Sequence, residues 1–570
     1  MPLSLFKKIY SIFDSDHKNY IFFIFLIFFL QMFLELFSVS LFIPLISIIL
    51  DTNIETNSFY LFFKNKLNID IKFLLGDIKS FLLFFIGVFI LKSCLTIFCN
   101  WKKIGFTYKI RKFLTNHLYK NYLQSPYEIF ISKNSSEYLK NINYEVSTTS
   151  EGLLQLLELF SEIIIITGII IFLLSYNFEV TLIVFLIALL AIFIINFLTK
   201  RKISSLGEKA RLFEQLRTQN FLESFNLIKE IKIYGNEKFF FDKNLNFTSN
   251  FLNNDFFYRF IKSIPRVLIE LTIILIFIVL VIINFDTVEN FYLLEILGVF
   301  AAAAYRLLPS SVRIINSLQV SKFSSPAINN IISEIKSKNY TFNQSSNKKD
   351  INKFDQKIEF LNVTFKYKET NKNILNNFNL KISKNKIYGF KGKTGSGKTT
   401  IINLLAGLIF PQKGTISIDN LAYEDINMAS LHKIISYVPQ NIYLMDSSIK
   451  ENILFGSNKY SSAELENAIK KSNLDEFINQ LPDGIDTIIG EKSSKISGGQ
   501  SQRIGIARAL IKKPSILILD ESTNSLDKNT EDLILQSISK LKKNLTIIMV
   551  SHSSSSLKIC EEIIDLDDNK

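Results

Sequence analysis

Long apolar runs fill most of the first 320 residues, and they decide what this chain can fold into. Each of six runs is at least as long as the roughly 20 residues that an α-helix needs to cross the hydrocarbon core of a bilayer. Because a backbone inside lipid must satisfy its own hydrogen bonds, these runs predict a helical membrane domain with six spans. The spans are expected near residues 20–50, 74–100, 152–176, 179–199, 264–285 and 291–312.

The rest of the chain has a different pattern. Residues 355–570 alternate short apolar runs with polar segments, as a soluble α/β domain does, so the mean hydropathy of +0.23 averages two unlike parts. Residues 336–354 are rich in Lys, Asn and Ser and poor in apolar side chains, which is typical of a linker. We therefore predict a transmembrane domain with long cytoplasmic extensions over 1–335, a linker over 336–354 and a soluble domain over 355–570.

Basic residues indicate how the membrane domain is oriented. Lys and Arg cluster before the first apolar run and after the second and fourth, and cytoplasmic loops carry such an excess. The long polar stretches 101–151 and 200–263 are then cytoplasmic, and the short turns lie outside. The first outer loop, 51–73, mixes apolar and polar residues and is compatible with a short interfacial helix.

Net charge and cysteine usage narrow the class further. A net charge of +13 suits either nucleic acid or anionic lipid, and the position of the basic residues beside apolar runs favours lipid. We therefore expect a membrane partner and no nucleic acid. The three cysteines, Cys94, Cys99 and Cys560, form no metal-type spacing, so no disulfide framework is expected.

Residues 392–399, with the sequence GKTGSGKT, form the strongest functional motif. They follow a predicted buried strand, 387–391, and precede an apolar helix pattern, which is the context that a phosphate-binding P-loop requires. Backbone N–H groups of such a loop close around phosphate oxygens, and the helix dipole adds to the attraction. We expect Lys398 to reach the β- and γ-phosphates of ATP and the Thr399 hydroxyl to bind Mg²⁺. The predicted nucleotide-binding residues of the loop are Gly392, Lys393, Thr394, Gly395, Ser396, Gly397, Lys398, Thr399 and Thr400.

Two further motifs support phosphate chemistry. The apolar strand 516–519 ends in Asp520 and Glu521, and in P-loop enzymes the first such acid holds Mg²⁺ while the second can polarise the attacking water. Taken alone, the pattern fits equally well a buried strand followed by solvated acids. A second glycine-rich turn opens a helix shortly before this strand, and we interpret it as another phosphate cradle. It consists of Ser497, Gly498, Gly499 and Gln500.

The complete set of motifs over 355–570 resembles the ABC ATPase domain. The resemblance adds Tyr367 as the aromatic that would stack on adenine, Gln440 in YVPQN, Asp527 in Ser-Leu-Asp, and His552 in VSH. It implies that two such domains stack head to tail, with each ATP between one P-loop and the other subunit's signature motif. It also implies that Glu521 is the catalytic base and His552 senses the γ-phosphate. Gln440 would couple Mg²⁺ and the attacking water to the membrane domain. Ile496 and Ser553 depart from the common pattern, at positions that carry no chemistry.

The membrane half resembles the type IV exporter arrangement, in which six spans precede the ATPase domain. That resemblance implies coupling helices near Ser125–Phe130 and Leu227–Gly235. Charged residues within spans are costly and often face a partner or a wet cavity. Lys92, Arg266, Arg306 and Arg313 are such residues, and we predict that they line an inner cavity and bind an anionic head group. The alternative is snorkelling or salt bridges to Glu35, Glu158, Glu162, Glu270 or Glu295.

The whole chain also resembles the PglK-type lipid-linked oligosaccharide flippases of bacterial N-glycosylation. The shared residues are the run 305–307 with Pro309 and Arg313, the turn 264–266 followed by Glu270, Glu35 with Ser40 and Pro44, and YVPQNIYL around Gln440. The resemblance implies an external helix, which would be 57–68 here. Lys92 stands where such a flippase carries Arg, so charge is kept but a bidentate fork is lost.

These patterns together predict a homodimeric bacterial inner-membrane flippase. ATP and Mg²⁺ would drive a polyprenyl-pyrophosphate-linked glycan across the membrane, with the ATPase domain in the cytoplasm. One alternative is the export of another amphipathic substrate, such as a lipid A-like lipid, a drug or a peptide. A second alternative is an ATP-gated regulator that transports nothing.

Overall fold

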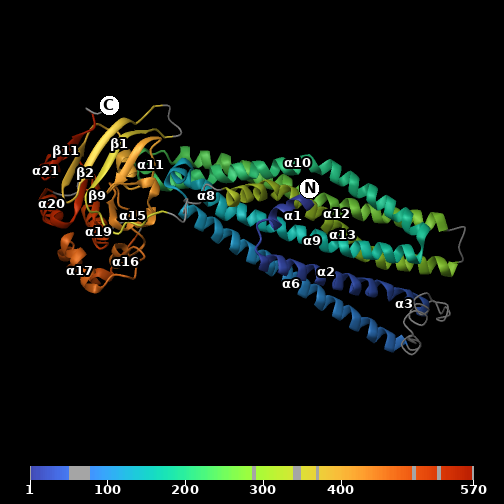
Figure 1. The fold of residues 1–570 in the computed structure, drawn as a ribbon. Helices are drawn as coiled ribbons and strands as arrows, with labels where there is room; N and C mark the ends of the chain where they lie inside the picture. Colours follow the sequence, from blue (N-terminus) through green and yellow to red (C-terminus); the bar gives the residue numbers. More distant parts are fainter. Residues whose placement is uncertain are drawn as a thin grey trace. The chain divides into compact units, whose positions relative to one another are not determined.

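The computed structural model describes residues 2–49, 78–284, 290–337, 348–367, 372–490, 496–522 and 528–567. The chain forms two compact units, a helical unit that runs from α1 to α13 and an α/β unit (Figure 1). The short segment Pro126–Phe130 belongs with the α/β unit, although it lies between two helices of the helical unit in the sequence. The expected outer loop 51–73 and its helix 57–68 lie outside the described residues.

Four very long helices build most of the helical unit. The helices α6, α10, α12 and α13 contain 47, 49, 48 and 47 residues. At 1.5 Å per residue they reach roughly 70 Å, more than twice the thickness of a hydrocarbon core, so each extends far beyond the bilayer. The helices are α1 (Pro2–Tyr10), α2 (Ser15–Ser40), α3 (Phe42–Ile49), α6 (Ile78–Gln124), α7 (Tyr127–Ser132), α8 (Ser135–Lys140), α9 (Val146–Tyr176), α10 (Phe178–Asn226), α11 (Ile228–Tyr234), α12 (Glu237–Asn284) and α13 (Asn290–Lys336), and a π-helical turn, Asn141–Glu145, links α8 to α9.

Three helical stretches of the described residues are long and apolar enough to cross a membrane. They are Ser15–Ile46, Ile78–Gln124 and Ser135–Tyr176, and they coincide with the first three predicted spans. The remaining predicted spans fall within α10, α12 and α13. In α10 the apolar part found among the described residues, Phe178–Leu190, is shorter than a full crossing.

The helix α9 lies at the centre of the helical unit, in contact with α2, α6, α10 and α13. Ile165 and Ile169 of α9 are fully buried in one apolar cluster with residues of α2 and α13. At Gly152 a Cβ atom would lie 2.8 Å from the Cβ of Ser324. Glycine at this position therefore permits the close approach of α9 and α13, as small residues do between membrane helices.

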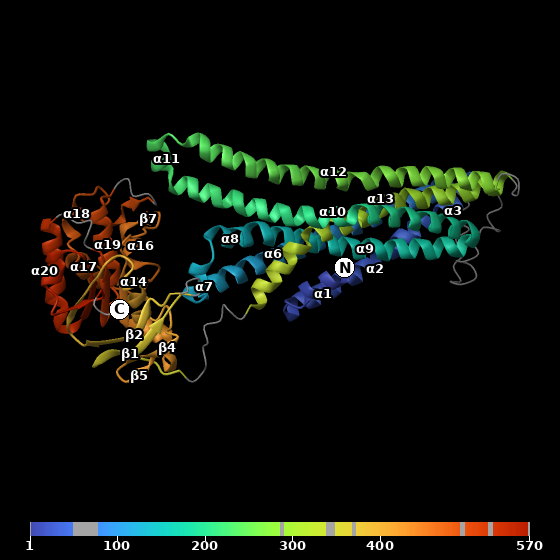
Figure 2. The same cartoon turned by 90° about the horizontal axis from the view of Figure 1, so that it is seen from above.

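Two short helices connect the long ones at their polar ends. Helices α10 and α12 run side by side, and α11 joins them (Figure 2). Gly235 ends α11 in the left-handed region, at a φ of +65°, which a glycine adopts without strain. The helices α7 and α11 lie where the coupling helices were predicted, at 125–130 and 227–235. Their coupling role stays a prediction.

The α/β unit contains a five-stranded parallel sheet of order β11-β3-β10-β9-β6, a four-stranded antiparallel sheet of order β2-β1-β4-β5, and the pair β7-β8. The strands are β1 (Lys357–Phe365), β2 (Leu375–Ser383), β3 (Ile387–Lys391), β4 (Lys413–Ile418), β5 (Leu421–Ala422), β6 (Ile435–Val438), β7 (Ser447–Ser448), β8 (Ile488–Ile489), β9 (Ile516–Asp520), β10 (Thr546–Val550) and β11 (Glu562–Asp565). The helices are α14 (Lys398–Leu405), α15 (Met428–Ile434), α16 (Ile449–Leu454), α17 (Ser462–Lys471), α18 (Asp475–Asn479), α19 (Gly498–Leu510), α20 (Lys528–Leu541) and α21 (Ser554–Lys558).

Apolar side chains of other elements cover both faces of the parallel sheet, which explains why the sequences of its strands are mostly continuous apolar runs. Alternate residues of β9 point to opposite faces. Ile516 and Ile518 belong to one core cluster with residues of α14 and the antiparallel sheet. Leu517 and Leu519 belong to another cluster with residues of α19 and α20. The sheet thereby lies between two layers of apolar side chains.

Candidate functional site

The carboxyl ends of four parallel strands meet at one edge of the sheet. In the register, Val550 at the end of β10 pairs with Phe390 of β3 and with Asp520 of β9. Leu519 pairs in turn with Val438 of β6. The P-loop after β3, the two acids at the end of β9 and the residues after β6 and β10 are therefore brought to the same edge.

The P-loop forms the turn between β3 and α14. Its glycines Gly395 and Gly397 have φ angles of +82° and +100°, which glycine adopts readily and other residues rarely do. The Lys398 ammonium donates to the backbone carbonyls of Gly392 at 2.6 Å and Lys393 at 3.0 Å, so the side chain folds back over the loop. The chain thus holds a cation above a ring of backbone groups.

Buried groups of the loop fit a phosphate ligand. The Ser396 hydroxyl is buried and has no hydrogen-bond partner. The backbone at Gly392 passes so close that a Cβ atom there would lie 2.7 Å from this hydroxyl. Thr400 is 4% exposed, whereas Thr399, at the second position of α14, is exposed. An unpaired donor beside exposed N–H groups at a helix N-terminus suits an anionic oxygen.

Glu521 lies close to Gln440 and His552, the two other residues predicted to take part in catalysis. Gln440 donates from Nε2 to Glu521 Oε2 at 2.7 Å, and His552 Nε2 lies 3.5 Å from Glu521 Oε1. The three residues come from three different strand ends, after β6, β9 and β10. An acid held between an amide and an imidazole at the edge of a phosphate cradle can orient and deprotonate a water molecule.

The backbone at Glu521 is strained. Its φ angle is +46°, in the left-handed region that costs a residue with a side chain on the order of 1 kcal/mol or more. Its N–H donates to the Val550 carbonyl at 2.9 Å, which ties the turn to β10. The hydrogen bond to β10 therefore helps to maintain this unfavourable conformation.

Asp520 lies beside Glu521 in a partly buried position. Burial raises the pKa of Asp520 above its usual value, and the neighbouring Glu521 charge acts in the same direction. The Tyr437 hydroxyl donates to Asp520 Oδ2 at 3.1 Å and, together with the Lys398 charge, lowers that pKa. Tyr437 is the first residue of the YVPQN motif, but the sequence analysis assigned a role only to Gln440 of that motif. Its position in that motif, one residue before the end of β6, is the signal that could have suggested a role for Tyr437.

These residues also fit a magnesium ion. The described residues include no group of three His, Cys, Asp or Glu side chains that could hold a metal by themselves. Mg²⁺ normally keeps water and phosphate ligands and needs only one or two protein groups. Asp520, with Thr399 and Gln440, would supply those groups, and the ion would neutralise charge on the transferred phosphate.

The predicted second cradle forms the start of α19. The Ser497 hydroxyl accepts from the Gln500 N–H at 3.2 Å, and the Gln500 side chain accepts from the Ser497 N–H at 2.8 Å. This capping box leaves Gly498 and Gly499 in the first turn, where backbone N–H groups have no helical partner. Tyr367 packs edge-on against Phe365 at 5.0 Å. Asp527 lies outside the described residues.

Alternating charges connect four helices of the membrane domain. Arg306 lies between two carboxylates, with Nε 3.0 Å from Glu35 and Nη1 3.7 Å from Glu162. Arg313 Nε lies 2.6 Å from Glu162, and Lys92 Nζ lies 2.8 Å from Glu35. The network runs in the order Lys92, Glu35, Arg306, Glu162, Arg313, Glu158 and Lys103.

The predicted substrate cations are thus paired, as in the alternative that the sequence left open. Arg266 pairs with Glu270 at 3.0 Å, one turn away on α12. The side chains differ in accessibility: those of Arg306 and Lys92 are 11% and 16% exposed, whereas those of Arg313 and Arg266 are 37% and 74% exposed. Substrate binding by these residues stays a prediction, and the exposed pair is better placed for it.

Comparisons with known proteins identify both units. The family model of the ABC transporter transmembrane region matches residues 21–303, and the ABC transporter model matches residues 375–524. The chain is 45% identical over 214 residues to a putative export ATP-binding/permease protein of Rickettsia typhi, a match that covers 37% of each chain. It is 41% identical over 231 residues to an ATP-dependent lipid A-core flippase of Blochmanniella floridana, covering 40% of each. The chain therefore matches well under half the length of these relatives.

A solved structure is similar over nearly the whole chain. It is that of a bacterial Atm1-family ABC exporter with ATP bound, with a TM-score of 0.81 and 19% sequence identity. The match covers 97% of this chain and 95% of the other. It confirms the predicted fold class, a helical exporter-type membrane domain followed by an α/β ATPase domain.

Proposed function

The chain belongs to the ABC transporters, and from this premise we propose that two copies of it form an ATP-driven flippase for a glycolipid. The observation that supports the ATPase reaction is the cluster of Glu521, Gln440 and His552 beside the P-loop. Glu521 would act as general base toward the attacking water. Lys398 would hold the β- and γ-phosphates, and magnesium bound through Asp520 would stabilise the developing charge.

A second copy of the chain is required because the signature motif, which is the phosphate cradle of residues 497–500, would bind the ATP held by another chain. In one chain the start of α19 offers unpaired N–H groups, and the predicted head-to-tail dimer would apply them to the ATP held by the other P-loop. ATP would then join the two ATPase domains, and hydrolysis would release them. The long helices of the membrane domain would convert this cycle into a change of access across the inner membrane.

The substrate that we propose is a lipid-linked oligosaccharide, whose glycan is joined to a polyprenyl chain through pyrophosphate. The cations on α12 and α13 support an anionic junction between head and chain. Similarity to the PglK-type flippases supports a role in N-glycosylation. The relatives described as lipid A-core flippases favour a second candidate, a phosphorylated lipid A-like glycolipid.

Reconstitution tests this function. Purified protein in proteoliposomes should hydrolyse ATP and move a fluorescent lipid-linked oligosaccharide between leaflets, and a fluorescent lipid A-core run in parallel ranks the two candidates. Lys398→Ala serves as the control, since loss of a charge-assisted phosphate contact should remove most of both activities. ATP hydrolysis without movement of either lipid would refute the flippase and favour an ATP-gated regulator.

A further inference from the structure

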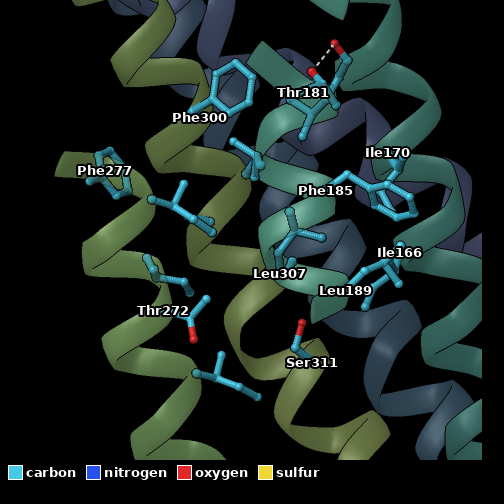
Figure 3. Close-up of a pocket in the computed structure, with 18 of the residues that line it drawn as sticks. Ile166, Ile170, Thr181, Phe185, Leu189, Thr272, Phe277, Phe300, Leu307 and Ser311 are labelled. Carbon is cyan, nitrogen blue, oxygen red and sulfur yellow. Dashed lines mark hydrogen bonds between the residues drawn. The ribbon is translucent and has the colours of Figure 1, made fainter. Parts of the chain in front are cut away.

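The helices α9, α12 and α13 line two cavities that follow one another along their length. The first, lined also by α10, has a volume of about 200 Å³ (Figure 3). The second, lined also by α6 and the π-helical turn, has a volume of about 730 Å³. We call the first the apolar cavity and the second the polar cavity. On α12, residues between 269 and 277 line the apolar cavity and residues between 251 and 263 line the polar cavity. On α13, the corresponding ranges are 300–314 and 316–324.

The first cavity offers almost nothing to a polar group. Aliphatic and aromatic side chains line it, and its hydroxyls come from Thr181, Thr272 and Ser311 (Figure 3). The Thr272 hydroxyl donates to the Leu268 carbonyl of the same helix at 2.7 Å, and that of Thr181 in α10 donates to the Leu173 carbonyl of α9 at 2.9 Å, so both hydroxyls already have backbone acceptors. A cavity of about 150 Å³ with such a lining stays dry and takes up apolar molecules. This one therefore suits a segment of hydrocarbon chain.

The second cavity has the opposite character. Its lining includes Arg111, Arg259 and Lys262 against the acids Glu151 and Asp255, so cations are in excess by one. Two buried side-chain oxygens of its lining, Asn316 Oδ1 and Ser324 Oγ, have no hydrogen-bond partner. Ser324 is 1% exposed. A volume of this size is within the usual range of ligand sites, and unpaired buried polar atoms indicate that a polar ligand completes them.

Aromatic rings add flat surfaces to the same cavity. Tyr258 and Phe323 stack at 4.1 Å, and Tyr144 meets Phe251 edge-on at 6.4 Å. The phenol of Tyr144 can both donate and accept a hydrogen bond. Rings, hydroxyls, an amide and a few charges are the groups that recognise a hydroxyl-rich head such as a glycan.

The boundary between the cavities carries cations. Arg266 lies on α12 between Ser263 of the polar cavity and Ile269 of the apolar one. Arg313 lies on α13 next to Ile314, the last residue of this helix in the lining of the apolar cavity, and three residues before Asn316 of the polar one. Both arginines are partly exposed, so a phosphate could exchange for their carboxylate partners. The order polar, cationic, apolar along the helices equals the order glycan, phosphate, hydrocarbon in a phosphate-linked glycolipid.

We propose that α9, α12 and α13 of one protomer form a single site for a phosphate-linked glycolipid, with the glycan in the polar cavity and the first part of the hydrocarbon chain in the apolar cavity. The inference rests on the proposed function and specifies where its substrate binds. It makes Asn316 and Ser324 head-group ligands and Ala304 part of the chain cavity.

Photolabelling of the full-length protein in nanodiscs, without nucleotide, tests the site. One probe is a dodecyl-phosphoglucose with a diazirine in its chain, and the other is the matching diazirine dodecanol. The phosphoglucose probe should label peptides within 166–189, 269–277 and 300–314. Filling the apolar cavity with Ala304→Phe should reduce this labelling roughly tenfold, as overpacking excludes a guest. The control Ala301→Phe, exposed on the same helix, should leave it unchanged.

The head-group half of the site is tested by Asn316→Ala. It should weaken labelling by the phosphoglucose probe roughly fivefold, the effect of one lost hydrogen bond, and leave dodecanol labelling unchanged. Asn329→Ala, at an exposed position of α13, is the matched control. Labelling by the phosphoglucose probe that is the same in Ala304→Phe as in the wild type would overturn the proposal. Absence of labelling in the wild type would also overturn it, and would indicate that a second copy of the chain fills the cavities. The photolabelling needs no ATP, so it tests the binding site separately from transport. If the protein flips lipid but does not bind the probe in these cavities, the proposed function remains and only the proposed site is wrong.

Discussion

Glu521 combines a costly backbone angle with a precise set of neighbours, and the two observations explain each other. A φ of +46° persists only where surrounding contacts maintain it, here the hydrogen bond to Val550 and the contact with Gln440. Strain at the end of a buried strand is therefore associated with the residue that would act on water. The motif identified the acid, whereas its conformation is a property of the folded sheet.

Replacing Glu521 by Gln should separate nucleotide binding from hydrolysis. The amide keeps the shape of the side chain but cannot accept a proton, so turnover should fall by about 100-fold or more while ATP stays bound. Phosphate release and retention of labelled ATP on the purified protein measure the two effects. Near wild-type phosphate release would remove Glu521 from the role of base.

Tyr437→Phe should change how nucleotide binding depends on pH. The Tyr437 hydroxyl lowers the pKa of Asp520, whose pKa burial raises. Without that donor the pKa should rise further, so Asp520 becomes protonated at a higher pH. Magnesium-dependent ATP binding should then be lost earlier as the pH falls, and titration of wild type and variant side by side measures this. A shift toward lower pH, or none, would show that the Tyr437 hydroxyl does not influence Asp520.

At the scale of elements, the ionic network pairs charged side chains that lie between helices of the helical unit. Glu35 is 2% exposed and lies within 3.0 Å of both Lys92 and Arg306, so α2, α6 and α13 meet at one carboxylate. Each pair costs desolvation, which the contact offsets only while both partners are present. The network therefore specifies how the helices align more than it stabilises them.

Glu35→Gln should destabilise the helical unit by about 3 kcal/mol, because two buried cations lose their main carboxylate. The midpoint of thermal unfolding in detergent should fall clearly. Glu208→Gln, an exposed acid on α10, should leave the midpoint nearly unchanged and is the control. Equal midpoints for both variants would show that water already screens the network.

The sequence predicted elements well where the signal is local. The apolar runs and the strand–loop–helix motif depend on neighbouring residues, so the first three spans and the P-loop turn could be placed from the sequence alone. Contacts between distant helices carry no such signal. Arg306 contacts Glu35 and Glu162, both far away in the sequence, and five acids were open as candidates. The two cavities and the role of Tyr437 depend in the same way on packing.

At the scale of the whole molecule, transport requires that two separate units respond to each other. The predicted ATP site lies in the α/β unit, and the proposed substrate cations lie in the helical unit. Changes confined to the second should therefore leave the catalytic groups assembled. A substitution that separates flipping from ATP hydrolysis would accordingly show that these cations act on substrate.

Arg266 and Arg313 provide that substitution. Arg266 lies outside the ionic network, and Arg313, although it is a member of the network, is more exposed than Arg306. The double variant Arg266→Gln, Arg313→Gln should lose flipping of a lipid-linked glycan at least tenfold, since each lost contact to phosphate costs roughly 1–3 kcal/mol. Basal ATP hydrolysis in the same proteoliposomes should stay near that of the wild type. If the arginines only support the fold, expression, the thermal midpoint and both activities should fall together. Retained flipping by a well-folded double variant would instead show that the anionic junction of the substrate is bound elsewhere, and the boundary between the two cavities would lose its assigned ligand.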